Sequence, residues 1–98
     1  MESMSLEKLF GIIKSRAREK PKGSYVASLF AKGKDSIVQK VGEEAVEVVI
    51  ASKNKNKKAL ISELADLWFH ALVLMVSLNI SPGDIEKELE RRHKSESG

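Results

Sequence analysis

The chain has 98 residues, of which 42% are hydrophobic and 32% charged, with two prolines and six glycines. This composition excludes a disordered chain and predicts one small soluble domain, in which a second chain is expected to complete the core. The net charge of +3 suits an anionic ligand without requiring nucleic acid. Cysteine is absent, which excludes disulfides, thiolate zinc sites and cysteine nucleophiles. No secretory signal is visible at the N-terminus, so a cytoplasmic protein is expected.

Apolar residues at helical spacing predict a first amphipathic helix from about residue 5 to 20, with Ser5 as its candidate N-cap. The stretch KPKGS that follows has the composition of a turn. Ser24 is then predicted to cap a short helix, YVASLFAK, that stops at Gly33. The N-terminal third of the chain therefore predicts two helices joined by a turn.

Asp35 is predicted to cap a longer helix from residue 36 to about 53. Its β-branched residues would also suit a strand. The helix is preferred because the charged positions recur every three or four residues, whereas a half-buried strand would alternate by two.

A polar basic connector, KNKNKK, separates this helix from another that is predicted from about residue 59 to 79. Its stretch LADLWFHALVLMVSL is apolar on nearly every side, which is typical of a helix surrounded by other helices. Trp68 and Phe69 are accordingly expected in the core of a bundle shared by two chains. A membrane span is not expected, because the run falls short of about 18 to 20 apolar residues and contains Asp66 and His70.

The stretch SPGD predicts the start of a final helix that runs to about residue 92, because it supplies a cap, a proline at the first helical position and an acid near the third. Residues 94–98 are expected to fray. Residues 1–98 are thus expected to form a single all-α domain.

Five carboxylates interrupt the apolar pattern of the two central helices. Glu43, Glu44 and Glu47 fall within one sector of about 100°, and Glu63 and Asp66 are neighbours on the facing helix if the two helices pack antiparallel. Acidic residues are mostly solvent-exposed, but an unpaired carboxylate among the apolar neighbours of Asp66 would be costly. A Lys, an Arg or a divalent cation is expected to meet it, and oxygen ligands converging from two helices suit Mg²⁺ or Mn²⁺.

The pattern EExxE, fifteen residues and ExxD resembles that of the MazG-like all-α nucleotide pyrophosphohydrolases. The stretches SYVASL, KVGEEAVE and ADLWFH, in that order, resemble the phosphoribosyl-ATP pyrophosphatases of histidine biosynthesis, and the resemblance runs from about residue 6 to 93. It implies a MazG-like helical bundle completed by homodimerisation. The implied reaction is Mg²⁺-dependent hydrolysis of phosphoribosyl-ATP to phosphoribosyl-AMP and diphosphate, the second step of histidine biosynthesis.

The resemblance also implies roles for the five acids. Glu44, Glu47, Glu63 and Asp66 correspond to metal ligands, and Glu43 to a nearby acid that binds metal or orients a ligand or water. Glu44 or Glu47 is the candidate to accept a proton from the attacking water. The sequence leaves open which of the two does so.

Candidate substrate contacts each have a plainer alternative. Lys40 either contacts phosphate or forms an intrahelical ion pair, and Lys34 is a second phosphate candidate. Ser24 and Tyr25 serve as a helix cap and a packing residue, or contact the phosphate or ribose of the substrate. His70 is expected as a hydrogen-bonded buried histidine that orients Asp66, with substrate contact as the alternative.

Two other functions compete with this assignment. A MazG-like house-cleaning nucleoside triphosphate pyrophosphohydrolase would share the same acids. A non-enzymatic helical adaptor or nucleic-acid binder would use KNKNKK and the terminal RRHK, but no helix-turn-helix or aromatic platform accompanies them. A small-molecule substrate is therefore expected, with neither a nucleic-acid nor a membrane partner.

Overall fold

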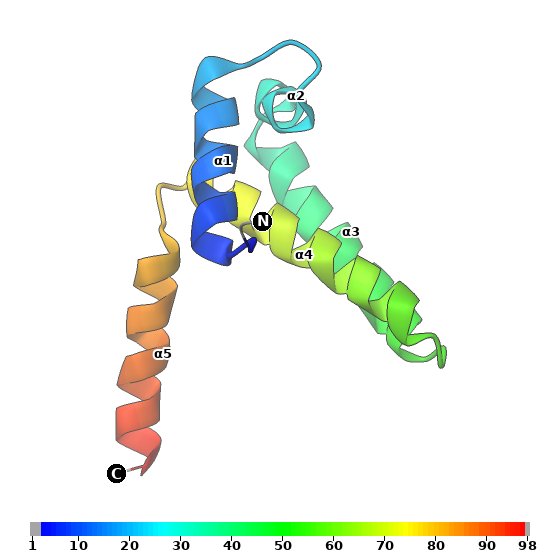
Figure 1. The fold of residues 1–98 in the computed structure, drawn as a ribbon, viewed down its shortest axis with the longest axis vertical. Coiled ribbons are helices and arrows are strands. Elements are labelled where there is room, and N and C mark those ends of the chain that lie inside the picture. The colour runs from blue at the N-terminus through cyan, green and yellow to red at the C-terminus, as the bar shows by residue number, and fades with distance from the viewer. Residues whose placement is uncertain (1–2, 98) are drawn as a thin grey trace.

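The fold is that of a computed structural model that describes residues 3–97. These residues form five α-helices and no strand, which confirms the all-α class. The helices are α1 (Leu6–Glu19), α2 (Tyr25–Lys32), α3 (Lys34–Ser52), α4 (Lys57–Ser77) and α5 (Pro82–Ser97) (Figure 1). Helices α3 and α4 form a long antiparallel hairpin, whereas α1 and α2 lie at one end of it.

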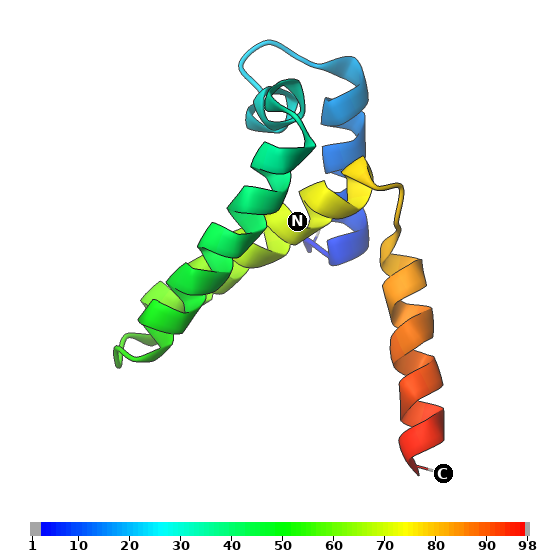
Figure 2. The ribbon, with the colours of Figure 1, turned by 180° about the vertical axis from the view of Figure 1, so that it is seen from behind.

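The hydrophobic core lies at that end of the hairpin, where α1 and α2 meet the start of α3 and the second half of α4 (Figures 1 and 2). Its side chains are almost completely removed from solvent, and each helix from α1 to α4 contributes at least one of them. The core residues are Ile13, Val26, Leu29, Ile37, Leu72 and Val73.

The two predicted serine caps are confirmed. Ser5 Oγ accepts a hydrogen bond from the Lys8 N–H and Ser24 Oγ accepts one from the Ala27 N–H, each at 3.1 Å. These bonds satisfy backbone donors that the first turn of a helix leaves without an intrahelical partner.

The predicted Asp35 cap is wrong. Helix α3 begins at Lys34, and its N-cap is Gly33, which has a φ of 106° and offers no side-chain cap. Because glycine tolerates this conformation, the chain passes from α2 into α3 through a single residue. Asp35 instead lies in the first turn of α3, where its negative charge favours the helix N-terminus.

Helix α4 begins at Lys57, two residues before the predicted start, because Asn56 Oδ1 accepts a hydrogen bond from the Ala59 N–H at 3.1 Å. The connection between α3 and α4 is therefore shorter than the basic stretch suggested. A short connection between antiparallel helices fixes which residues of the two helices face each other.

Helix α5 begins as predicted. The Ser81 N–H donates to the Asp84 carboxylate at 2.9 Å, and the Asp84 N–H donates to Ser81 Oγ at 3.2 Å. The helix continues to Ser97, beyond the predicted end near residue 92. Within it, Glu88 forms ion pairs with Arg91 and Arg92 at 2.6 and 2.9 Å. Fraying from residue 94 stays a prediction, and Gly98 lies outside the described residues. Helix α5 extends away from the hairpin (Figure 2).

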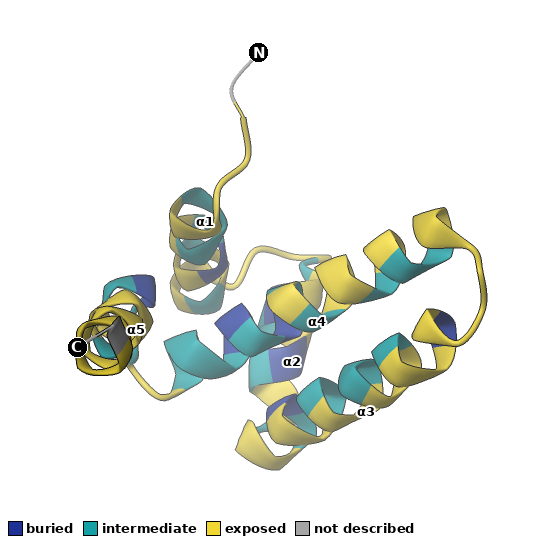
Figure 3. Cartoon of the chain, turned by 90° about the horizontal axis from the view of Figure 1, so that it is seen from below, coloured by how far each residue is buried: buried dark blue, intermediate teal, exposed yellow. Residues whose placement is uncertain are grey.

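The N-terminal half of α4 is more exposed than its apolar sequence suggested (Figure 3). Trp68, which was expected in the core, is 57% exposed, whereas Phe69 packs against the core as predicted. The reason is angular: Trp68 follows Asp66 by two residues, or about 200°, so it points away from the face that Asp66 shares with α3. Helix α4 is also long and apolar enough to cross a membrane by length and composition, so the length argument against a span does not hold, although Glu63 and Asp66 remain within it.

Candidate metal centre and neighbouring pocket

Three carboxylates from the facing sides of α3 and α4 come together. One oxygen from each of Glu44, Glu63 and Asp66 lies within 4.8 Å of the other two. Glu44 comes from α3, and Glu63 and Asp66 come from successive turns of α4. Glu44 and Glu63 are partly buried, but Asp66 is exposed, so the expectation that apolar neighbours enclose Asp66 is wrong. The antiparallel hairpin therefore converts two separate acidic motifs of the sequence into one group of oxygen atoms.

Glu47 lies next to this group. It lines a surface hollow of about 330 Å³ together with Glu63, one turn of α3 beyond Glu44. Its negative charge acts on Glu63, as described below. Four of the five predicted acids are thus neighbours across the α3–α4 hairpin.

The pKa of Glu63 reflects partial desolvation and the close approach of these acids. The pKa of the Glu63 carboxyl is raised above its usual value, first by partial desolvation and then by the negative charges of Glu47, Asp66 and Glu44. Like charges at close range disfavour ionisation, and a cation among them would reverse the effect. Carboxylate oxygens are the ligands that Mg²⁺ and Mn²⁺ prefer, so the donor set of this group fits either ion.

Glu43 takes part in different contacts. Its carboxylate accepts a hydrogen bond from Gln39 Nε2 at 2.8 Å and pairs with Lys40 Nζ at 3.6 Å, and these contacts hold its pKa below the usual value. It stands outside the three-carboxylate group, although it adjoins Glu44 in the chain. The intrahelical ion pair considered for Lys40 is confirmed.

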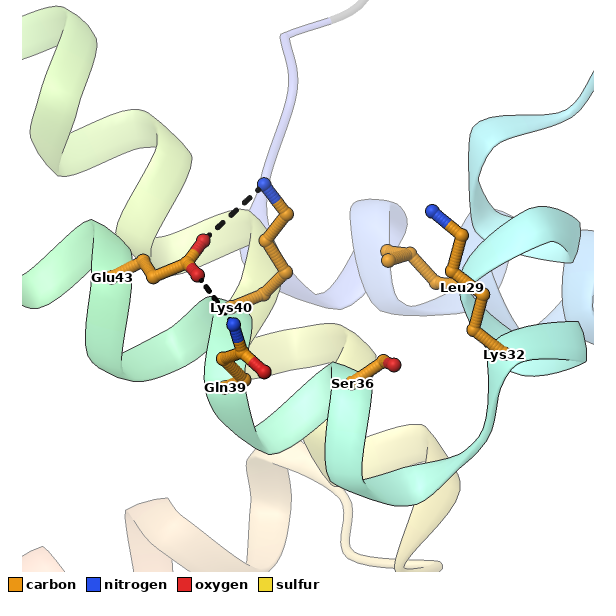
Figure 4. A pocket seen from close by; sticks show the side chains of 6 residues that line it. All are labelled: Leu29, Lys32, Ser36, Gln39, Lys40 and Glu43. Carbon is orange, nitrogen blue, oxygen red and sulfur yellow. Dashed lines mark hydrogen bonds and ion pairs between the residues drawn. The ribbon is translucent and has the colours of Figure 1, made fainter.

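Glu43 and Lys40 line a pocket of about 160 Å³ between α2 and α3 (Figure 4). The same pocket is lined by Lys32 and Leu29 of α2 and by Ser36 and Gln39 of α3. Lys34, the other predicted phosphate contact, is the exposed first residue of α3 and is not among the lining residues.

Tyr25, His70 and Asp66 are linked by hydrogen bonds. His70 is 6% exposed, and its Nδ1 lies 2.7 Å from the Asp66 backbone oxygen, which can only accept, so Nδ1 carries the proton. The Nε2 atom of the neutral ring then accepts from the Tyr25 hydroxyl at 2.9 Å. The expected hydrogen-bonded, buried histidine is confirmed, and its contact with Asp66 is made through the backbone.

Comparison with known proteins identifies the family. A family model described as phosphoribosyl-ATP pyrophosphohydrolase matches residues 6–93. The chain belongs to the phosphoribosyl-ATP pyrophosphohydrolase family.

Three similar proteins are named phosphoribosyl-ATP pyrophosphatase. That of Leptospira biflexa is 54% identical over 88 residues, which cover 90% of this chain and 96% of the relative. Those of Metallosphaera sedula and Saccharolobus islandicus are 53% and 47% identical and cover 91% and 96% of this chain. The alignments also cover 96% and 100% of those two relatives.

For this member of the phosphoribosyl-ATP pyrophosphohydrolase family, sequence reasoning missed Lys32, Ser36 and Gln39. The last two carried a detectable signal, because Ser36 precedes Lys40, and Gln39 precedes Glu43, by the four residues that place side chains on one helix face. Lys32 carried none, since its approach to that face depends on the angle between α2 and α3 set by Gly33.

Proposed function

We propose that this protein hydrolyses phosphoribosyl-ATP to phosphoribosyl-AMP and diphosphate in the cytoplasm, as the second step of histidine biosynthesis. The observation that carries the proposal is the group of three carboxylates within 4.8 Å, in a chain 47–54% identical over nearly its full length to proteins named for this reaction. A carboxylate cluster alone would not select this substrate, and the family membership supplies that choice.

Glu44, Glu63 and Asp66 are the proposed ligands of Mg²⁺, or of Mn²⁺, with Glu47 beside them as a fourth ligand or a base. These carboxylates would hold the ion, which would supply the positive charge needed to offset the negative charge that develops on the phosphate oxygens during hydrolysis. Without such an intermediary, four acids would repel a triphosphate.

Glu44 and Glu47 are the candidates to take the proton from the attacking water. We favour Glu47, because a carboxylate outside the close group of three stays more available as a base than one that holds a cation. Glu43 would orient substrate or water from the adjoining pocket. It lies on the side of α3 where it contacts Gln39 and Lys40.

Ser24, Tyr25, Lys34, Lys40 and His70 are retained as the proposed surroundings of the substrate. Ser24 and His70 would act indirectly, since the first caps α2 and the second is buried beneath Tyr25. Tyr25 is 47% exposed, so it is accessible for a direct contact.

The functional test is diphosphate release from phosphoribosyl-ATP, with ATP and dCTP as competing substrates and Mg²⁺ supplied or chelated. Asp66→Asn and Glu47→Gln should lower turnover by more than about 100-fold, since changes around metal ligands alone cost 10- to 100-fold. The far-ultraviolet circular dichroism should stay helical. Glu86→Gln, an equal charge change on exposed α5, is the control.

Two results would contradict the proposal. Equal turnover of ATP or dCTP would instead support the MazG-like house-cleaning enzyme, which shares the acids. Full activity in both the Asp66 and Glu47 variants would show that the metal site is wrongly assigned.

We also propose a homodimer, because exposed apolar side chains gather on one face of α4, as they do at protein–protein interfaces. Ile61, Leu64 and Trp68 are 59%, 36% and 57% exposed, and Trp68 adjoins exposed Leu6 in a hollow of about 350 Å³. Sedimentation should give a dimer that Trp68→Arg weakens. A stable wild-type monomer would contradict this assembly.

A further inference from the structure

We propose that the pocket between α2 and α3, lined by Lys32, Ser36, Gln39, Lys40 and Glu43, binds the 5′-phosphate of the phosphoribosyl group of the substrate. This inference rests on the proposed function and names a second anchoring point for the same molecule. It concerns the phosphate that distinguishes phosphoribosyl-ATP from ordinary nucleoside triphosphates.

The pocket offers the donors that a phosphate group requires. The amino groups of Lys32 and Lys40 come from different helices and extend to the same side of the pocket (Figure 4). Ser36 adds a hydroxyl between them, and Gln39 adds an amide on the Glu43 side of Lys40 (Figure 4). The pocket volume of about 160 Å³ is several times the roughly 30 Å³ of liquid per water molecule, so a phosphate group fits.

The charges of the pocket favour an anion. Within residues 3–97, Lys32 has neither an ion pair nor a hydrogen-bonding partner for its amino group. Lys40 has one ion pair, with Glu43 at 3.6 Å, and both side chains are more than one third exposed. Such exposed pairs contribute little, so Lys40 can turn to a phosphate at small cost. Glu43, the one acid in the lining, is also held by Gln39.

The distance between the pocket and the carboxylate group indicates which phosphate of the substrate the pocket binds. Along α3, Lys40 and Ser36 precede Glu44 by four and eight residues, or about 6 and 12 Å at 1.5 Å per residue. Phosphoribosyl-ATP carries its triphosphate on one ribose and a single phosphate on a second ribose joined to the base. With the triphosphate at the carboxylate group, the second ribose and its phosphate can reach this distance.

This placement gives the pocket a role in substrate choice. ATP and dCTP can present a triphosphate to the carboxylate group, but they have no phosphate on the far side of the base. Binding energy gained in this pocket would therefore act on phosphoribosyl-ATP alone.

The experiment compares single substitutions under steady-state conditions. Lys32→Gln should raise the KM for phosphoribosyl-ATP about tenfold or more with kcat nearly unchanged, because it removes a charge-assisted contact remote from the reacting bond. Lys32→Arg should restore most of the lost affinity, and Ser36→Ala should give a smaller rise in KM. Lys14→Gln, the same charge change on an exposed residue of α1, is the control.

A second measurement identifies which phosphate is bound. ATP is used as a competitive inhibitor, and its inhibition constant should be the same for the wild type and Lys32→Gln. An equal weakening of ATP inhibition would mean that the pocket holds a triphosphate oxygen, and would overturn the inference.

Other outcomes also decide the matter. An unchanged KM in Lys32→Gln, or a loss of affinity in Lys34→Gln without one in Lys32→Gln, overturns the inference while leaving the proposed function intact. A wild-type protein that releases no diphosphate from phosphoribosyl-ATP contradicts both proposals.

Discussion

The two halves of α4, residues 57–68 and 69–77, both contain apolar side chains but have different surroundings, and the four charged residues of the helix all lie in the first half. In the C-terminal half, Leu72 and Val73 are at most 4% exposed because α1 and α2 pack around them. In the N-terminal half, Ile61 and Trp68 are 59% and 57% exposed, while Glu63 and Asp66 belong to the acidic group shared with α3. The C-terminal half is therefore buried by other helices of the same chain. The N-terminal half has acids on the side that faces α3 and exposed apolar side chains on the opposite side.

Ile61 is exposed although it is as apolar as buried Leu72 and Val73, so the burial of an apolar side chain on α4 depends on which helices lie beside it. Among residues 3–97, the acids at this part of the hairpin have no ion-pair partner, and Trp68 is left 57% exposed. We infer that a cation balances the charge of the acids and that a second chain covers Trp68. The metal site and the dimer interface would then lie at the same end of the hairpin.

The largest expected effect is a loss of stability when the core around the C-terminal half of α4 is disrupted. Ile13→Ala removes a fully buried side chain and should lower the free energy of unfolding by about 2–5 kcal/mol. Urea unfolding should show this loss at every protein concentration. For Ile61→Ala, any loss should shrink on dilution, because it would act through association of two chains. A concentration-independent loss of similar size at Ile61 would remove the contrast between the two halves.

The sequence predicted those features that depend on local chemistry. The caps Ser5 and Ser24, the turn before α5 and the helical spacing of the acids all follow from residues within a few positions of each other. The grouping of Glu44 with Glu63 and Asp66 needed one further assumption, that a short connection makes α3 and α4 antiparallel.

Features set by the angles between helices could not be predicted in this way. Gly33 turns the chain so sharply that the Asp35 cap is replaced, and the same turn brings Lys32 beside Lys40. The exposure of Trp68 depends on which sides of α4 the other helices leave open. No residue type or spacing in the sequence specifies these arrangements by itself.

A smaller effect is expected where the two halves of α4 meet. Tyr25→Phe keeps the ring that stacks on Phe69 but removes the hydroxyl that donates to buried His70. The free energy of unfolding should fall by about 0.5–1.5 kcal/mol, the usual net contribution of such a bond. Ser28→Ala, which removes a hydroxyl bonded only to its own helix, is the control for thermal unfolding. Equal stability of Tyr25→Phe and the wild type would show that this link does not hold α2 against α4.

The smallest expected effect is a gain in stability, and it concerns the acids of the N-terminal half of α4. Because partial desolvation and then the charges of Glu47, Asp66 and Glu44 raise the pKa of Glu63, the ionised Glu63 carboxylate should destabilise the metal-free protein at neutral pH. Glu63→Gln should therefore raise the melting temperature slightly in the presence of a chelator. Added Mg²⁺ should stabilise the wild type by binding its folded state, and should stabilise Glu63→Gln much less. Glu86→Gln should change neither value. If Glu63→Gln instead lowered the stability of the metal-free protein, the acids would be held by contacts within the chain, and the need for a cation at this end of the hairpin would disappear.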